Sequence, residues 1–354
     1  MKTNHNFFST LALNLAEKNL GKTKTNPSVG CVIVKDGSVI SSAVTSVNGR
    51  PHAEFNALNK KIDFKGAYMY VTLEPCTHYG KTPPCTKIIK EKQLKKVFYL
   101  FDDPDFRTHK KAKKIINKIK KLPTHAYKNL DIYRGYFLNQ IEKFPQIDAK
   151  IAISNDYFTI SKKDKWITNC RSRKVAHFIR SQYDCIISTS NSINKDNSLL
   201  NCRINGLNKY KPDLVIIDRF LRLKKKLKLL NLANKRKTYI LTSSNNPKKI
   251  SFFKKRKIKI IKIDNLKNKK DFTKLFKKLF DLGKRRVLIE SGLVFLNQLF
   301  KFRFVDNLYL FKSNKSLKDK GFNNSSVNFL KKIKNINKVK VNLQKESLFK
   351  IRIR

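Results

Sequence analysis

Short apolar segments alternate along this chain with longer segments that have the period of an amphipathic helix. In the first half, strands are expected at residues 30–34, 38–44, 68–73 and 97–101, and helices at residues 52–60, 85–92 and 110–121. Strands that alternate with helices after an opening hairpin are typical of a layered α/β domain with a mixed sheet. The alternation resumes after Phe144-Pro145, and 354 residues suffice for two domains. We therefore expect one domain in residues 1–145 and a second α/β domain in residues 146–354.

The apolar run near the N-terminus, residues 7–16, is interrupted by Asn14 and is followed by no small-residue cleavage site. Phe8, Leu11 and Leu15 recur at helical spacing, so an amphipathic helix is expected there and not a signal peptide. No apolar run approaches the roughly 18 residues of a membrane-spanning helix. We expect a cytoplasmic protein without a membrane partner.

The chain is strongly basic, with 79 Lys and Arg against 25 Asp and Glu and a formal net charge of +54. Such a charge fits a nucleic-acid binder. However, lysine is spread over the whole chain, as in residues 110–121, 224–228, 248–257 and 331–340, and Asn and Ile are also abundant. This spread favours a compositional drift and a solvated basic surface over a specific nucleic-acid site. In either case the field should attract anionic substrates such as phosphates.

Two short segments, residues 51–54 and 74–85, contain the residue types of a metal site. His52, Cys76 and Cys85 offer one imidazole and two thiolates, which suits Zn²⁺ with a fourth position open for water. Glu54 lies two residues after His52 at an expected helix start, where it can face that water without binding the metal. A His-x-Glu followed by Pro-Cys and a later Cys is the signature of zinc deaminases, in which the Glu moves protons.

Eight residues separate Cys76 from Cys85, unlike the Cys-x-x-Cys pattern of nucleoside and nucleic-acid deaminases. With this spacing, with Asn26-Pro27-x-Val29-Gly30, and with residues 72–85, the chain resembles the RibD family of bifunctional riboflavin-biosynthesis deaminase/reductases. The resemblance implies a cytidine-deaminase-like three-layer domain with a mixed sheet. It implies zinc-dependent deamination of 2,5-diamino-6-(5-phosphoribosylamino)pyrimidin-4(3H)-one.

The resemblance also implies roles for individual residues of the first domain. The zinc ligands would be His52, Cys76 and Cys85, the catalytic proton shuttle Glu54, and the substrate-pocket residues Asn26, His78 and Lys81. Lys81 would pair with the substrate phosphate as a point charge. The sequence departs from the family at Thr45, seven residues before His52, where the family usually has a His.

The resemblance continues more weakly through the second half, over Trp166-Ile167-Thr168, residues 195–203 and Glu290-Ser291-Gly292. It implies a dihydrofolate-reductase-like α/β domain that uses NADPH to reduce the ribosyl group of the deaminated product to ribityl. The implied cofactor-binding residues are Ala152, Trp166, Ser192 and Asp196, and the implied substrate-binding residues are Asp164, Arg180, Leu200, Arg203 and Glu290. Arg180 and Arg203 would bind phosphate, because a guanidinium pairs well with phosphate oxygens.

Several departures from the family pattern in this half leave alternatives open. Tyr157 stands where the family has a glycine, Asn197-Ser198 replaces Asp-Pro, and Leu293-Val294 replaces the Pro-Thr of a glycine-rich turn. The domain could therefore be a reductase-like fold without catalysis. A nucleic-acid base deaminase and a basic RNA-binding protein on an inactive scaffold are further alternatives. The expected partners are phosphorylated ribosylaminopyrimidines, with no specific nucleic acid, and a homo-oligomer is left open.

Overall fold

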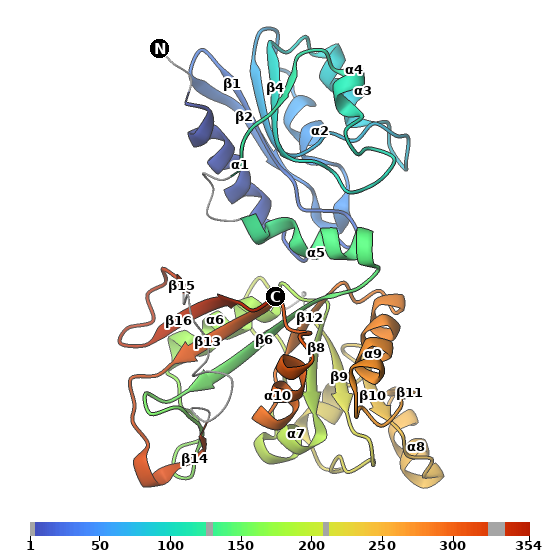
Figure 1. The fold of residues 1–354 in the computed structure, drawn as a ribbon, viewed down its shortest axis with the longest axis vertical. Coiled ribbons are helices and arrows are strands. Elements are labelled where there is room, and N and C mark those ends of the chain that lie inside the picture. Colours follow the sequence, from blue (N-terminus) through green and yellow to red (C-terminus); the bar gives the residue numbers. More distant parts are fainter. Residues whose placement is uncertain (1–3, 125–129, 208–211, 325–336) are drawn as a thin grey trace. The chain divides into compact units, whose positions relative to one another are not determined.

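The computed structural model describes residues 4–124, 130–207, 212–324 and 337–354, and the basic run at 331–340 lies largely outside them. The chain divides into two compact units, the first ending at Lys143 and the second beginning at Phe144. Each unit has its own sheet and helices (Figure 1). In the described ranges, every helix is too short or too polar to cross a lipid bilayer.

The first unit is built on a five-stranded mixed sheet with the strand order β2-β1-β3-β4-β5. Its strands are β1 (Gly30–Lys35), β2 (Ser38–Val44), β3 (Tyr68–Leu73), β4 (Lys96–Phe101) and β5 (Ile119–Lys121). Its helices are α1 (His5–Lys18), α2 (Ala53–Leu58), α3 (Cys85–Glu91), α4 (Ala112–Ile115) and α5 (Arg134–Phe137), with the short turns η1 (Val47–Gly49), η2 (Leu130–Tyr133) and η3 (Leu138–Glu142). Strands β1 and β2 are antiparallel, and β3, β4 and β5 are parallel to one another.

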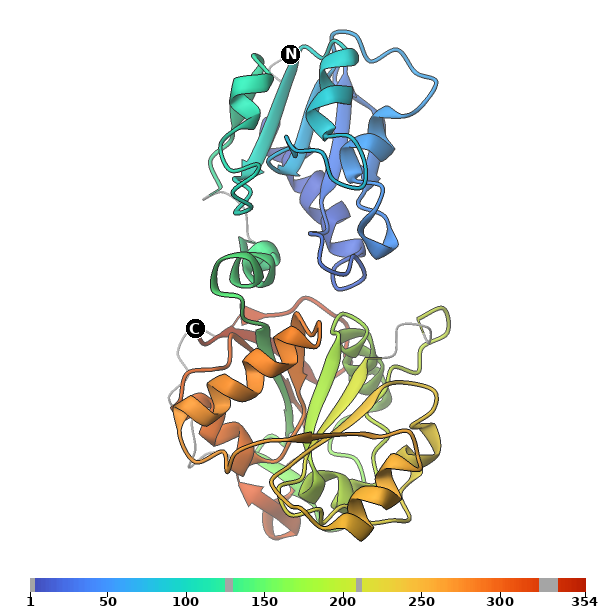
Figure 2. The ribbon, with the colours of Figure 1, turned by 90° about the vertical axis from the view of Figure 1, so that its right-hand side faces the viewer.

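Helices cover both faces of this sheet and make the three expected layers. Figures 1 and 2 show α1 on one side and α2 and α3 on the other. Gly30 lets α1 approach β1 closely, because a Cβ there would lie 1.9 Å from the carbonyl oxygen of Ala12. Asp36 and Gly37 both have positive φ, as the tight turn of the predicted β1–β2 hairpin requires. The central strands thus form much of the core, and the loops at their ends can carry functional residues.

The prediction of a basic helix at residues 110–121 is wrong over most of that range. Only the four residues of α4 are helical, and residues 119–121 form β5. Lysine favours a helix, but Ile119, Lys120 and Lys121 pair with β4 and complete the edge of the sheet. Tertiary pairing here outweighs local propensity.

The second unit contains a nine-stranded sheet with the order β11-β10-β9-β8-β12-β6-β13-β16-β15 and a two-stranded sheet, β14-β7. The strands are β6 (Gln146–Ile153), β7 (Phe158–Ser161), β8 (Cys185–Thr189), β9 (Asp213–Ile217), β10 (Thr238–Thr242), β11 (Lys259–Lys262), β12 (Arg286–Ile289), β13 (Asn307–Lys312), β14 (Gly321–Asn324), β15 (Asn337–Lys338) and β16 (Ser347–Arg352). The helices are α6 (Cys170–Arg180), α7 (Ser190–Asp196), α8 (Pro247–Lys254), α9 (Lys269–Asp281) and α10 (Leu293–Lys301), with the turns η4 (Lys228–Leu232) and η5 (Lys318–Lys320).

The large sheet separates two apolar cores, because successive strand residues point to opposite faces. Ile187, Val215 and Leu241 pack with α9 and α10, whereas Ile186, Leu214 and Ile240 pack with residues of α6, α7 and α8. Helices therefore cover both faces, as Figure 2 shows. Strands β8, β9, β12, β6 and β13 are parallel neighbours. Their carboxyl ends lie at one edge, where α/β sheets commonly bind ligands.

Candidate functional site

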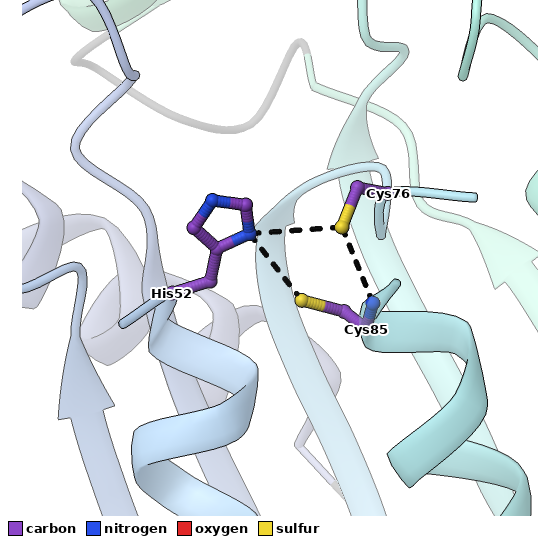
Figure 3. A group of neighbouring side chains, drawn as sticks. All are labelled: His52, Cys76 and Cys85. Carbon is purple, nitrogen blue, oxygen red and sulfur yellow. Dashed lines mark hydrogen bonds between the residues drawn. The ribbon is translucent and has the colours of Figure 1, made fainter. Parts of the chain in front are cut away.

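Three side chains that are far apart in the sequence meet at one end of the first sheet. His52 is the residue before α2, Cys76 lies in the loop after β3, and Cys85 begins α3. Their donor atoms point toward one another in Figure 3, with His52 Nδ1 3.6 Å from Cys76 Sγ and 3.4 Å from Cys85 Sγ. An imidazole nitrogen and a thiolate sulfur bound tetrahedrally to one zinc ion would be about 3.6 Å apart. The spacing of the donors therefore fits zinc.

The protonation of the cluster also suits a metal. Both Cys76 and Cys85 are free thiols. The Cys85 thiol, and then the His52 imidazole, donate hydrogen bonds to Cys76 and lower the pKa of that thiol despite its burial. The backbone amide of Cys85 also donates to Cys76 Sγ, at 3.2 Å. Cys76 is thus stabilised as the thiolate that a metal ion binds.

Glu54 lies in the first turn of α2 and is only 3% exposed. Burial raises the pKa of its carboxyl to about 7, with a further increase from Cys76 and an opposing effect of His52. Its Oε2 has no hydrogen-bond partner within the described residues. A buried acceptor without a partner calls for a ligand or water, and a carboxyl with a pKa near neutrality can accept and return a proton.

The residues expected to contact the substrate differ in their contacts with this cluster. Asn26 Nδ2 donates to the carbonyl oxygen of Gly49 at 2.8 Å and lies 3.5 Å from His52 Nε2. His78 Nδ1 lies 3.2 Å from the hydroxyl of Thr108, and Lys81 is exposed. Thr45 is buried, and its hydroxyl accepts from the amide of Val29 at 2.9 Å. Its hydroxyl is therefore bound within the fold.

The structure also shows a buried acid that sequence reasoning missed. Glu74 is 2% exposed and accepts hydrogen bonds from three backbone amides, those of Asp103 (3.3 Å), Lys110 (2.9 Å) and Ala112 (3.1 Å). It holds the loop of residues 102–112 beside the segment that carries Cys76. A charged residue at the end of the apolar strand β3, directly before Pro75-Cys76, was the available signal.

In the second unit, Glu290 follows β12 and is enclosed by two cations. Arg180 Nε lies 2.6 Å from Glu290 Oε1 and Arg180 Nη2 lies 2.9 Å from Oε2, while Lys150 Nζ lies 2.8 Å from Oε2. Burial alone would raise the pKa of Glu290, but the charges of Arg180 and Lys150 outweigh it and hold that pKa well below its usual range. Lys150, on β6, was missed by sequence reasoning because a lone lysine in so basic a chain carries no signal.

The pairing of Arg180 with Glu290 bears on the phosphate contact expected of that arginine. Two of its nitrogens face Glu290, and Nη1 donates to the carbonyl oxygen of Asn201 at 3.2 Å. Arg203 is exposed and donates to Asn201 Oδ1 at 2.6 Å. Leu200 is buried, with a positive φ of 46°. In this structure the face of Arg180 that could grip a phosphate binds a carboxylate.

Among the expected cofactor-binding residues, Ser192 is linked most directly to the sheet edge. Its hydroxyl accepts a hydrogen bond at 3.0 Å from the amide of Gly292, the residue before α10. The two residues lie just past the carboxyl ends of the adjacent parallel strands β8 and β12. The free amides at the start of α10 suit a phosphate group, so this edge fits a dinucleotide phosphate.

The remaining expected residues are more dispersed. Ala152 is half-buried on β6, and Asp196 is the exposed last residue of α7. Trp166 is 50% exposed, with the guanidinium of Arg173 4.9 Å from its ring centre. Asp164 is exposed and lies 3.9 Å from Lys315 Nζ. Trp166 and Asp164 thus lie against Arg173 and Lys315, which were not among the expected site residues.

Comparison with known proteins gives matches over both units. Residues 2–101 match the model of the cytidine and deoxycytidylate deaminase zinc-binding region, and residues 145–317 match the model of the RibD C-terminal domain. The riboflavin biosynthesis protein RibD of Aquifex aeolicus is 33% identical over 311 residues, 86% of this chain and 85% of that protein. The RibD of Actinobacillus pleuropneumoniae is 33% identical over 290 residues, 79% of this chain and 76% of that protein.

A solved structure extends the similarity to the whole chain. It is that of a diaminohydroxyphosphoribosylaminopyrimidine deaminase/5-amino-6-(5-phosphoribosylamino)uracil reductase from Thermotoga maritima, with 26% identity, a TM-score of 0.82 and 99% of each chain covered.

Proposed function

The chain belongs to the RibD family, and from that premise we propose which of its residues carry the two reactions of this bifunctional riboflavin-biosynthesis enzyme. It has a zinc-binding deaminase domain followed by an NADPH-dependent reductase domain. The resemblance stated from the motifs and the fold class expected from it are confirmed. We assign the deaminase to residues 1–145 and the reductase to residues 146–354.

The spacing of the three donor atoms is the observation that carries the deaminase assignment. His52, Cys76 and Cys85 would hold the zinc ion, which supplies Lewis acidity to a water molecule when bound. The reaction adds water to the ring carbon that bears the amino group, and then breaks the carbon–nitrogen bond to release ammonia. Glu54 accepts the proton of the attacking water and delivers it to the departing nitrogen, which its burial and its pKa of about 7 support.

The surrounding residues of the first domain would position the substrate. Asn26 and His78 hold the pyrimidine, and Lys81 meets the phosphate as a point charge. The location of Asn26 beside His52 supports this assignment for the ring. Thr45 takes no part, because its hydroxyl is bound to Val29.

In the second domain, NADPH supplies a hydride when bound, and reduction opens the ribosyl ring of the deaminated product to ribityl. Ala152, Trp166, Ser192 and Asp196 would bind the cofactor, and the hydrogen bond between Ser192 and Gly292 at the sheet edge supports a phosphate-binding role there. Asp164, Leu200 and Arg203 would contact the substrate. Lys150 and Arg180 keep Glu290 ionised and oriented at the end of β12.

We further propose that the substrates are the only specific partners, with no nucleic acid bound at either site. The high charge then serves to attract phosphorylated substrates. Location in the cytoplasm stays an expectation from the sequence.

One incubation tests both assignments. Purified, zinc-loaded protein is mixed with the diaminopyrimidine substrate, with and without NADPH, and the products are separated. We expect deaminated product alone without NADPH, and reduced product with it. Deamination without any NADPH oxidation would indicate that the second domain is not catalytic, and binding of the protein to RNA without any turnover would favour the basic RNA-binding alternative.

A further inference from the structure

A second cation lies beside the loop that carries Lys81. Arg50 Nη1 donates a hydrogen bond to the hydroxyl of Thr82. Its other terminal nitrogen, Nη2, lies against Gly80, where an added Cβ would be only 3.1 Å away. Arg50 thus contacts the residues on both sides of Lys81. A side chain at Gly80 would crowd the guanidinium in this position.

The backbone at Arg50 is fixed by residues already assigned to the deaminase site. The carbonyl oxygen of Gly49, directly before Arg50, accepts from Asn26 Nδ2 at 2.8 Å. His52, a donor of the metal cluster, is two residues further on. The backbone of Arg50 therefore lies between Gly49, which Asn26 binds, and the segment that carries the metal donor His52.

No ion pair joins Arg50 to an acidic side chain anywhere in the described part of the chain. A guanidinium has five N–H donors, and Thr82 takes one of them. An anion with several oxygens can use the others, and phosphate matches the guanidinium fork better than it matches a lysine.

We propose that Arg50 is a ligand of the substrate phosphate and acts with Lys81 as a two-cation clamp that selects phosphorylated over unphosphorylated pyrimidine substrates. The proposal rests on the proposed deaminase function. Thr82 is a positioning residue in this scheme, because its hydroxyl orients the fork of Arg50 without contacting the substrate.

The test compares the phosphorylated substrate with its unphosphorylated riboside, using Arg50→Gln, Arg50→Lys and the wild-type protein, each zinc-loaded. We expect Arg50→Gln to raise KM for the phosphorylated substrate about tenfold with kcat within about twofold, and to change kcat/KM for the riboside less than about twofold. Arg50→Lys keeps the charge without the fork and should raise KM about threefold. The inhibition constant of inorganic phosphate should rise in the same order.

Lys90→Gln is the matched control, because Lys90 is an exposed cation in the last turn of α3. It removes the same charge and should change KM for the phosphorylated substrate and KM for the riboside by less than about twofold. A loss on Lys90→Gln equal to that on Arg50→Gln would overturn the proposal in favour of the general field. The proposal would also be overturned if Arg50→Gln lowered kcat/KM equally for both substrates, or if it lowered kcat without raising KM.

Thr82→Val keeps the shape of the side chain and removes its hydroxyl, so the test does not depend on the folding of an Arg50 variant. It should raise KM for the phosphorylated substrate about threefold, and Thr82→Ser should restore it. An unchanged KM in Thr82→Val would overturn the positioning role. Wild-type protein that deaminates both substrates with equal kcat/KM would refute the clamp alone, whereas deamination of neither would refute the deaminase function together with it.

Discussion

Glu54 in the first domain and Glu290 in the second are both buried beside a proposed site, but the pKa of one is raised and the pKa of the other is lowered. Glu54 has an Oε2 without a hydrogen-bond partner in the described residues and a pKa raised by burial to about 7. Glu290 is buried to a similar degree, but Arg180 and Lys150 hold its pKa well below the usual range. Burial is therefore common to both, and the neighbouring charges decide the protonation state. The first carboxyl can exchange a proton near neutral pH, and the second is kept as an anion.

The most severe test of this contrast is Glu54→Gln. A neutral amide cannot accept the proton of the attacking water, so deamination should fall by about a thousandfold. The zinc content and the reduction of the deaminated intermediate should stay at wild-type values, because the change leaves the three metal donors and the second domain intact. Ammonia release and metal analysis measure the two effects. Deamination within tenfold of wild type would contradict the assigned role.

The corresponding change in the second domain is Glu290→Gln, and its effect should be on stability as well as on reduction. It leaves two largely buried cations, Arg180 and Lys150, without their anion, which should cost about 3 kcal/mol of unfolding free energy. Trp166 is the only tryptophan of the chain, so its fluorescence follows the unfolding of this domain.

Asp264→Asn provides the matched control for that loss. Asp264 forms an ion pair with Lys274 in which both side chains are more than half exposed. Its removal should leave the unfolding free energy unchanged within experimental error, because exposed ion pairs contribute little to stability. If Glu290→Gln and Asp264→Asn lowered the unfolding free energy equally, the ion pairs of Glu290 with Arg180 and Lys150 would not stabilise the domain.

A pH-dependent stability difference should appear with Asp103→Asn in the first domain. Burial raises the pKa of Asp103 from 3.8 to about 6. Between these values the folded protein binds more protons than the unfolded one, so this carboxyl adds stability as the pH falls from 7 to 5, by about 1 kcal/mol. Asparagine does not titrate, and its Oδ1 can still accept from Asp105 and Tyr136. The measurement is urea unfolding of the wild-type protein and Asp103→Asn at pH 5 and pH 7, monitored by far-ultraviolet circular dichroism. If the two proteins showed the same change in stability between these pH values, Asp103 would have an ordinary pKa.

The smallest expected effect concerns Tyr157, which stands where the family has a glycine. Its φ of 69° lies in the left-handed region, and Lys312 Nζ is 5.0 Å from its ring centre. Tyr157→Gly relieves the backbone strain but frees the unfolded chain, so the net change in stability should be within about 1 kcal/mol. The KM for NADPH should fall about twofold to threefold, because the backbone can then approach the cofactor more closely. A higher KM would mean that the ring itself contacts the cofactor.

The same contrast explains how far the sequence alone could go. His52, Glu54, Cys76 and Cys85 were predictable because the metal site needs particular residue types, and they occur here within two short segments of the sequence. Lys150, Arg180 and Glu290 meet only through the arrangement of β6, β12 and α6 in the tertiary fold, and no local spacing links the three residues. The resemblance indicated two of these three residues, but it did not indicate that they bind one another.

The role of Glu74 could not be predicted from the sequence, because its partners are backbone amides, which almost any stretch of chain could offer. Arg50 was missed because its partner, the hydroxyl of Thr82, is 32 residues away in the sequence. The error at residues 110–121 has a related cause, since the pairing of β5 with β4 depends on backbone groups and not on the lysine side chains.

The anchor that Glu74 provides has a consequence for the tolerance of this loop to mutation. Its three donors, at Asp103, Lys110 and Ala112, are peptide groups, which every amino acid except proline possesses. A change of side chain at an exposed position of the loop, such as Lys110, therefore leaves the anchor in place. A proline at any of the three positions would remove one amide donor from a buried acid two residues before the metal donor Cys76.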